Sequence, residues 1–98
     1  MKILAIENEI EGVEWKGLEN LLKEEAQHVY KLYLSNSLRE IYFTEDKNAV
    51  LVLETDDRVS AIKLLDTLPL VKSGKIKFKV LELRPYTGYD RIMGSGSV

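Results

Sequence analysis

Apolar residues follow two periodicities along the chain, and together they predict six elements of secondary structure. Compact apolar runs bounded by charge predict strands at residues 2–9 and 49–53, with both faces at least partly covered. Alternation predicts strands over 38–44 and 75–83, while helical spacing predicts helices over about 14–34 and 55–68. The order strand, helix, strand, strand, helix, strand predicts an α+β fold, with two helices on one face of a four-stranded antiparallel sheet.

Single residues predict where these elements end and bend. Asn36, within Ser35-Asn36-Ser37, is expected to end the first helix in a left-handed conformation, and Pro69 to stop the second helix at Leu68. The alternation of the last strand slips after Val80, which predicts a bulge or a change of facing there. Strict alternation over 38–44 places Leu38, Glu40 and Tyr42 on one side and Arg39, Ile41 and Phe43 on the other.

The length of 98 residues predicts one domain over residues 1–93, including a C-terminal tail from residue 84, and a flexible Gly/Ser segment over 94–98. The tail carries Tyr86 and Tyr89 and is expected to pack on another surface. Ile3–Ile6 and Ala49–Leu53 are apolar at every position, so both faces of these strands need cover. A second copy of the chain can supply it, which predicts a homodimer or higher homo-oligomer formed through the sheet face.

Composition narrows the range of functions. Cysteine is absent and His28 is the sole histidine, which excludes disulfides, thiol catalysis and a His-rich or Cys-ligated metal site within one chain. The formal net charge is −2, and Lys75, Lys77 and Lys79 alternate as on a solvent-facing strand, so no nucleic acid partner is expected. No apolar stretch approaches the ~20 residues of a membrane span. We expect a cytoplasmic protein that needs no metal or cofactor and has no membrane partner.

Glu25 is the residue that the helical pattern does not explain. Leu21, Leu22 and Val29 lie three or four positions away, so the carboxylate shares their apolar face. Burial raises the pKa of a carboxyl, and His28 one turn later can approach Glu25 or Glu24, which suits an acid-base pair. The alternative is structural: Glu25 forms a buried ion pair with Arg39 on the next strand, and His28 borders the core.

The chain resembles the muconolactone isomerase-like family of the dimeric α+β barrel superfamily over about residues 18–86. The resemblance rests on Leu-Leu-Lys-Glu-Glu at 21–25, Leu38-Arg39, Leu68-Pro69-Leu70 and Arg84-Pro85. It implies a ferredoxin-like subunit whose paired sheets form a barrel. It also implies a cofactor-independent shift of a double bond by proton transfer, with Glu25 at the position of the acidic residue and Arg39 at that of an arginine.

Two departures from the family pattern concern the anion-binding part of the site. The second family arginine is replaced around Tyr42-Phe43, and the family His-Pro is Arg84-Pro85. We therefore expect an isomerase-type enzyme acting on a small organic substrate, which can be anionic, with Glu25 and His28 as catalytic residues. The expected substrate-binding residues are Arg39, Tyr42, Arg84 and Tyr86. The alternative function is a non-catalytic oligomeric protein that binds or responds to a small molecule.

Overall fold

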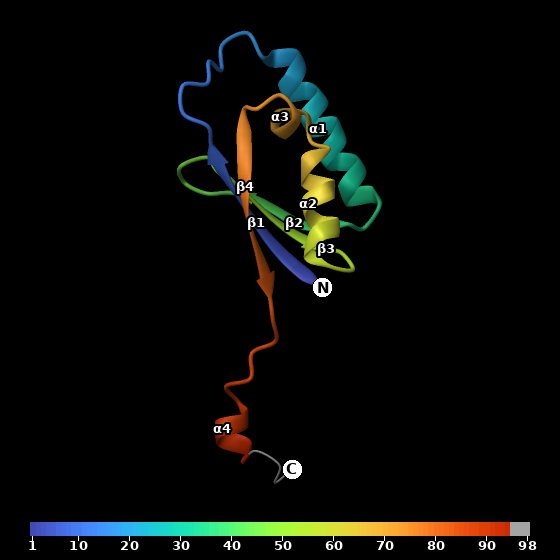
Figure 1. Ribbon diagram of the computed structural model, residues 1–98, viewed down its shortest axis with the longest axis vertical. Coiled ribbons are helices and arrows are strands. Elements are labelled where there is room, and N and C mark those ends of the chain that lie inside the picture. The colour runs from blue at the N-terminus through green and yellow to red at the C-terminus, as the bar shows by residue number, and fades with distance from the viewer. Residues whose placement is uncertain (95–98) are drawn as a thin grey trace.

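The computed structural model, which describes residues 1–94, has one antiparallel sheet covered on one face by helices (Figure 1). The strands are β1 (Lys2–Glu9), β2 (Leu38–Phe43), β3 (Ala49–Glu54) and β4 (Ile76–Leu83), in the order β2-β3-β1-β4. The covering helices are α1 (Glu19–Leu34), α2 (Arg58–Asp66) and α3 (Pro69–Lys72). This βαββαβ arrangement confirms the predicted α+β fold. Most of the predicted Gly/Ser segment, residues 95–98, lies outside the described residues.

Helix α1 begins at Glu19, later than the predicted start near residue 14. Gly17 has a φ of +79°, a left-handed conformation that a right-handed helix cannot include. The predicted end of the helix is confirmed. The Asn36 amide donates to the carbonyl oxygen of Tyr33 at 3.1 Å, and Asn36 has a φ of +67°. This left-handed residue turns the chain from α1 directly into β2.

Pro69 begins a helix as well as following one, which the sequence pattern did not predict. Helix α2 ends at Asp66, and Pro69 occupies the first turn of the short helix α3. Proline suits that position because its missing N–H would have no partner inside the helix. The other amides of the first turn of α3 also lack partners within the helix. One of them, the Leu70 amide, donates a hydrogen bond to the side chain of Glu25 instead.

The bulge in the sheet lies in β2. Near Val80, where a bulge or a change of facing was predicted, there is no bulge, and the apolar side chains change from the covered face to the open face. The register between β2 and β3 shifts between Leu38 and Glu40, whereas that between β1 and β4 is continuous from Lys2–Leu83 to Glu9–Ile76. The shift places Ile41 opposite Leu51 and so on the helix-covered face, together with Leu38. The strict alternation predicted for this strand was therefore wrong. In β4, Leu81 and Leu83 turn to the open face by ordinary alternation.

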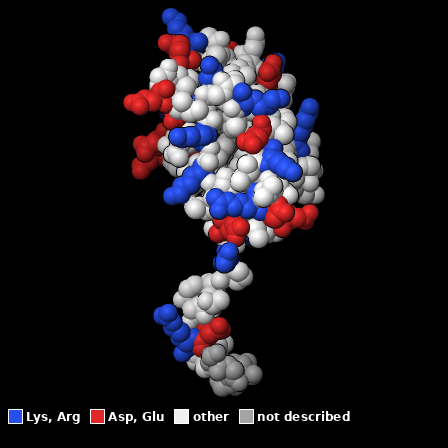
Figure 2. Space-filling model, in the orientation of Figure 1, with Lys and Arg blue, Asp and Glu red and all other residues white. Residues whose placement is uncertain are grey.

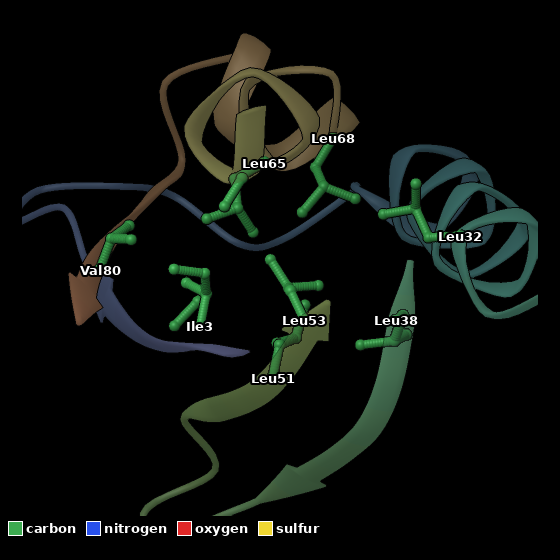
Figure 3. Close-up of a cluster of buried hydrophobic side chains, with 10 residues drawn as sticks. Ile3, Leu32, Leu38, Leu51, Leu53, Leu65, Leu68 and Val80 are labelled. Atoms are coloured by element: carbon green, nitrogen blue, oxygen red, sulfur yellow. The ribbon is translucent and has the colours of Figure 1, made fainter. Parts of the chain in front are cut away.

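The core lies between the helices and the sheet (Figure 3). Leu65 of α2, Leu68 at the start of α3 and Leu32 of α1 point toward the sheet. There they meet Ile3, Leu51 and Leu53 of the two central strands. The C-terminal tail, with the short helix α4 (Asp90–Met93), extends away from this body (Figure 1). Its Tyr86 and Tyr89 rings pack edge to face with centroids 5.0 Å apart. Among residues 1–94, no helix is long and apolar enough to cross a membrane.

Candidate functional site

A cavity of about 540 Å³ lies between α1 and the helix-covered face of the sheet. The β2 bulge contributes Ile41 and Phe43 to its wall, α1 contributes Val29, and α3 contributes Leu70. The cavity opens to solvent, because Tyr30 and Phe43 in its wall are exposed. Most of the lining is apolar, with five aromatic rings, those of Trp15, Tyr30, Tyr33, Phe43 and Phe78. Such a pocket, with a few polar groups, is typical of a small-molecule site.

Glu25 projects from α1 into this cavity. Its side chain is partly buried, and its Oε1 accepts a hydrogen bond of 3.0 Å from the Leu70 amide. Burial raises the pKa of Glu25 above its usual range, and the nearby Glu7 raises it further, while the bond from Leu70 acts in the opposite direction. Glu25 is thus a carboxyl group with a raised pKa at the wall of an apolar pocket, the property that its helical position predicted.

Glu7 is a second acidic group of the cavity, and sequence reasoning missed it. It is 8% exposed, and its Oε1 accepts a hydrogen bond of 2.8 Å from the Ala49 amide. From the sequence it was interpreted as the charge that bounds an apolar run. The signal that could have found it is the alternation of Ile3, Ala5 and Glu7, which places all three on the covered face of β1.

His28 and Arg39 do not line the cavity. The Nε2 of His28 lies 2.8 Å from the hydroxyl of Thr67 and so links α1 to the end of α2. Arg39 donates from Nε to the Asn36 carbonyl oxygen at 2.7 Å. Within residues 1–94 there is no ion pair between Glu25 and Arg39 and no hydrogen bond between Glu25 and His28. The structural alternative based on a Glu25–Arg39 pair is therefore wrong for this chain by itself.

The other predicted substrate-binding residues also lie elsewhere. Tyr42 is on the open face of the sheet and donates to Glu40 at 2.8 Å, a bond that raises the pKa of the Tyr42 hydroxyl. Arg84 donates to Glu82 at 3.0 Å, and Tyr86 belongs to the extended tail. Of the six residues that the sequence singled out, Glu25 alone lines the cavity of its own chain.

The arrangement can hold and move a proton. A carboxyl group whose protonated form is favoured by burial can donate a proton to a bound molecule and take one back, provided that a hydrogen-bonding atom of that molecule is within reach. The bond from Leu70 fixes one oxygen of Glu25, which orients the other. Among the described residues, no three histidine, cysteine, aspartate or glutamate side chains group as a metal site.

The topology defines the class of fold: a ferredoxin-like α+β subunit, with a four-stranded antiparallel sheet covered on one face by helices. A solved structure of that fold is similar to this chain: 5-chloro-2-hydroxyhydroquinone dehydrochlorinase (TftG) from Burkholderia phenoliruptrix AC1100, in complex with 2,5-dihydroxybenzoquinone. The TM-score is 0.61 and the identity 16%, over 90% of this chain and 98% of the other. No family model and no curated protein sequence matches the chain. At this identity the likeness shows the fold alone.

Proposed function

We propose that the protein is a small cofactor-independent enzyme that transfers a proton within a small organic substrate, in an isomerase-type reaction, with Glu25 as the general acid-base. The observation that carries the proposal is the Glu25 carboxyl, with its raised pKa, at the wall of an apolar cavity. The similarity to TftG also supports the proposal, because TftG has the same fold and is named as an enzyme that acts on a small ring compound. The resemblance to the muconolactone isomerase-like family also supports Glu25 as the general acid-base, because Glu25 lies at the position of the family's acidic residue.

The role of Glu25 follows from its surroundings. Apolar walls favour the protonated carboxyl, so the group can donate a proton to a substrate atom. Once ionised, Glu25 keeps the hydrogen bond from the Leu70 amide, which limits the cost of the charge. Most of the lining around the carboxyl is apolar, although the cavity opens to solvent. The same carboxyl can therefore take a proton from one atom of the substrate and return it to another.

We further propose that the protein is a homodimer formed through the open face of the sheet. Leu4, Ile6, Val50 and Val52 lie on this face, away from the helices, and they are only partly buried in one chain. Glu40 lies on one edge strand and Lys77 and Lys79 on the other. A two-fold axis parallel to the strands would bring opposite charges together at both edges of the apolar centre. A substrate-binding role for Arg39, Tyr42, Arg84 or Tyr86 requires such a second chain.

The proposed activity can be tested without a known substrate. Wild-type protein and the variants Glu25→Gln and Glu24→Gln are incubated in D₂O with a panel of small lactones, enolisable ketones and quinones. Proton NMR then reports deuterium entering carbon positions. Glu24 is the matched control because it is the exposed neighbour of Glu25 on the same helix and does not line the cavity. We expect exchange with the wild type and Glu24→Gln, and a loss of about 100-fold or more with Glu25→Gln.

The same panel distinguishes the alternative function. Compounds that shift the NMR signals of the cavity without exchange in any variant would contradict the enzyme and favour a non-catalytic small-molecule-binding protein. Equal exchange by the wild type and Glu25→Gln would contradict the role assigned to Glu25.

A further inference from the structure

The cavity contains buried negative charge without a positive partner. Glu7 is 8% exposed and Glu25 is partly buried, and each accepts one backbone hydrogen bond. Across residues 1–94, neither forms an ion pair. Buried carboxylates in proteins are usually paired with a cation or kept neutral. At Glu25 this requirement is met only in part. Burial and the neighbouring Glu7 raise its pKa and so favour the protonated, neutral carboxyl.

The other charged residues of the lining do not supply the missing positive charge. Lys47 is exposed, belongs to the turn between β2 and β3, and makes no ion pair with any described residue. Glu9 adds a third carboxylate at an exposed position. The lining thus has three acidic residues and one basic residue, and its charge is net negative. An anionic ligand would meet like charges at Glu7 and Glu25, which disfavours its binding.

We propose that the cavity binds organic cations, namely amines with an apolar ring or chain, in preference to anions or uncharged molecules of the same shape. The inference rests on the cavity being the small-molecule site of the proposed function, and it names the charge of the ligand. The ammonium group lies at Glu7 and Glu25, and the apolar part lies against Val29, Ile41 and the aromatic side chains. Aromatic rings add favourable interactions with a cation above their faces.

Two backbone amides report binding at the carboxylates. The Ala49 amide donates to Glu7 and the Leu70 amide donates to Glu25, so both signals should respond when a ligand reaches these oxygens. The probes are naphthylmethylamine, naphthylmethanol and naphthoate, which share one ring system and differ in charge. Nitrogen-proton NMR titrations give the affinity of each probe, and the two amides give its location.

We expect the amine to bind the wild-type protein about tenfold or more tightly than the alcohol, and the carboxylate to bind most weakly. High salt should reduce the preference for the amine, because it rests on charge. Glu7→Gln and Glu25→Gln should each reduce the ratio of amine to alcohol affinity, whereas Glu24→Gln should leave it unchanged. The ratio for the wild-type protein requires no variant, so a variant that fails to fold does not prevent the test.

Three outcomes would overturn the inference, and they differ in what they mean for the proposed function. Equal or tighter binding of naphthoate at the cavity overturns the preference for cations but leaves the cavity as a small-molecule site. Equal binding of the amine and the alcohol does the same. Failure of all three probes to shift the Ala49 and Leu70 amides overturns the inference together with the small-molecule role of the cavity.

Discussion

Opposing influences act on the ionisation of Glu25. Its burial and the neighbouring Glu7 favour the neutral carboxyl, while the amide of Leu70 favours the carboxylate. Burial is the largest of these effects, so the pKa of Glu25 is raised. The same residue is therefore a candidate acid-base group and a source of pH-dependent stability. Glu7 contributes to both properties, because it faces the same cavity from β1.

The raised pKa of Glu25 predicts how stability changes with pH. Between the ordinary glutamate pKa of about 4.3 and the higher pKa in the folded protein, the folded state binds more protons than the unfolded state. The contribution of Glu25 to stability is therefore complete at low pH and is lost as the pH rises through this interval. Glu25→Gln should flatten this decline, because glutamine does not ionise and its side-chain oxygen can still accept from Leu70.

Urea unfolding at a series of pH values, at one protein concentration, measures the effect. Glu24→Gln is the control and should keep the slope of the wild-type protein, since Glu24 is exposed. A Glu25→Gln slope identical to that of the wild type would show that the folded protein does not raise the pKa of Glu25.

At the scale of elements, the junctions of the helices position the site. The left-handed Asn36 turns the chain from α1 into β2, and the bulge that follows rotates Ile41 toward the cavity. Pro69 begins α3, whose first turn presents the Leu70 amide to Glu25. The cavity wall is thus shaped where elements begin and end.

The left-handed conformation of Asn36 predicts contrasting effects of two substitutions. A side chain with a Cβ but no polar group makes this conformation cost about 1–2 kcal/mol, whereas glycine adopts it freely. We therefore expect Asn36→Ala to lower the free energy of unfolding by about 1 kcal/mol, and Asn36→Gly to leave it nearly unchanged or raise it. Urea denaturation measures both variants. Equal destabilisation by alanine and glycine would indicate that the asparagine side chain itself, rather than the backbone conformation, stabilises the turn.

Substitution of the buried leucines of β3 should lower the free energy of unfolding more than substitution at most other positions. Leu53 is fully buried between the sheet and the helices (Figure 3), so Leu53→Ala leaves a cavity and should cost about 2–5 kcal/mol. Leu34→Ala is the matched control, because Leu34 is 60% exposed at the end of α1, and its effect should stay within about 0.5 kcal/mol. Thermal and urea unfolding compare the two. Similar costs for both leucines would contradict the assigned core.

At the scale of the whole molecule, one face of the sheet and the tail remain uncovered in the single chain. Positive and negative side chains are intermixed on the face of the body in Figure 2, and the tail also shows both signs. In the tail, the side chains of Tyr86, Tyr89 and Ile92 are each at least 66% exposed. Exposed apolar surface of this kind is typical of interfaces between subunits.

The proposed homodimer predicts a position at which one charge should separate the subunits. Val50 lies on the open face of β3, opposite Ile6 and Tyr42, so Val50→Lys would bury an unpaired charge at the interface. Val59→Lys is the matched control, because Val59 is an exposed residue of α2. Light scattering at micromolar concentration should give a dimer for the wild type and Val59→Lys, and a monomer for Val50→Lys. A monomeric wild-type protein would contradict the proposal.

Local patterns in the sequence determined the elements, their order and the acidic group of α1. Periodicity, left-handed residues and helix breakers act over a few neighbouring positions, so they can be interpreted without knowing the fold. They predicted the βαββαβ arrangement, the end of α1 at Leu34 followed by the left-handed Asn36, and the placement of Glu25 on an apolar helix face. The predicted start of α1 near residue 14 was too early, because helical spacing does not indicate that Gly17 adopts a left-handed conformation.

The tertiary structure decided which groups share the cavity. Glu7 and Glu25 approach each other only because β1 lies at the centre of the sheet beneath the helices, and the amides of Ala49 and Leu70 reach them from two further elements. The bulge in β2, and hence the wall formed by Ile41, depends on its register with β3. Contacts and registers of this kind join residues far apart in the chain, and no local periodicity specifies them. The sequence alone therefore determined the elements and one candidate proton carrier, while the packing of distant segments decided the charge and shape of the site.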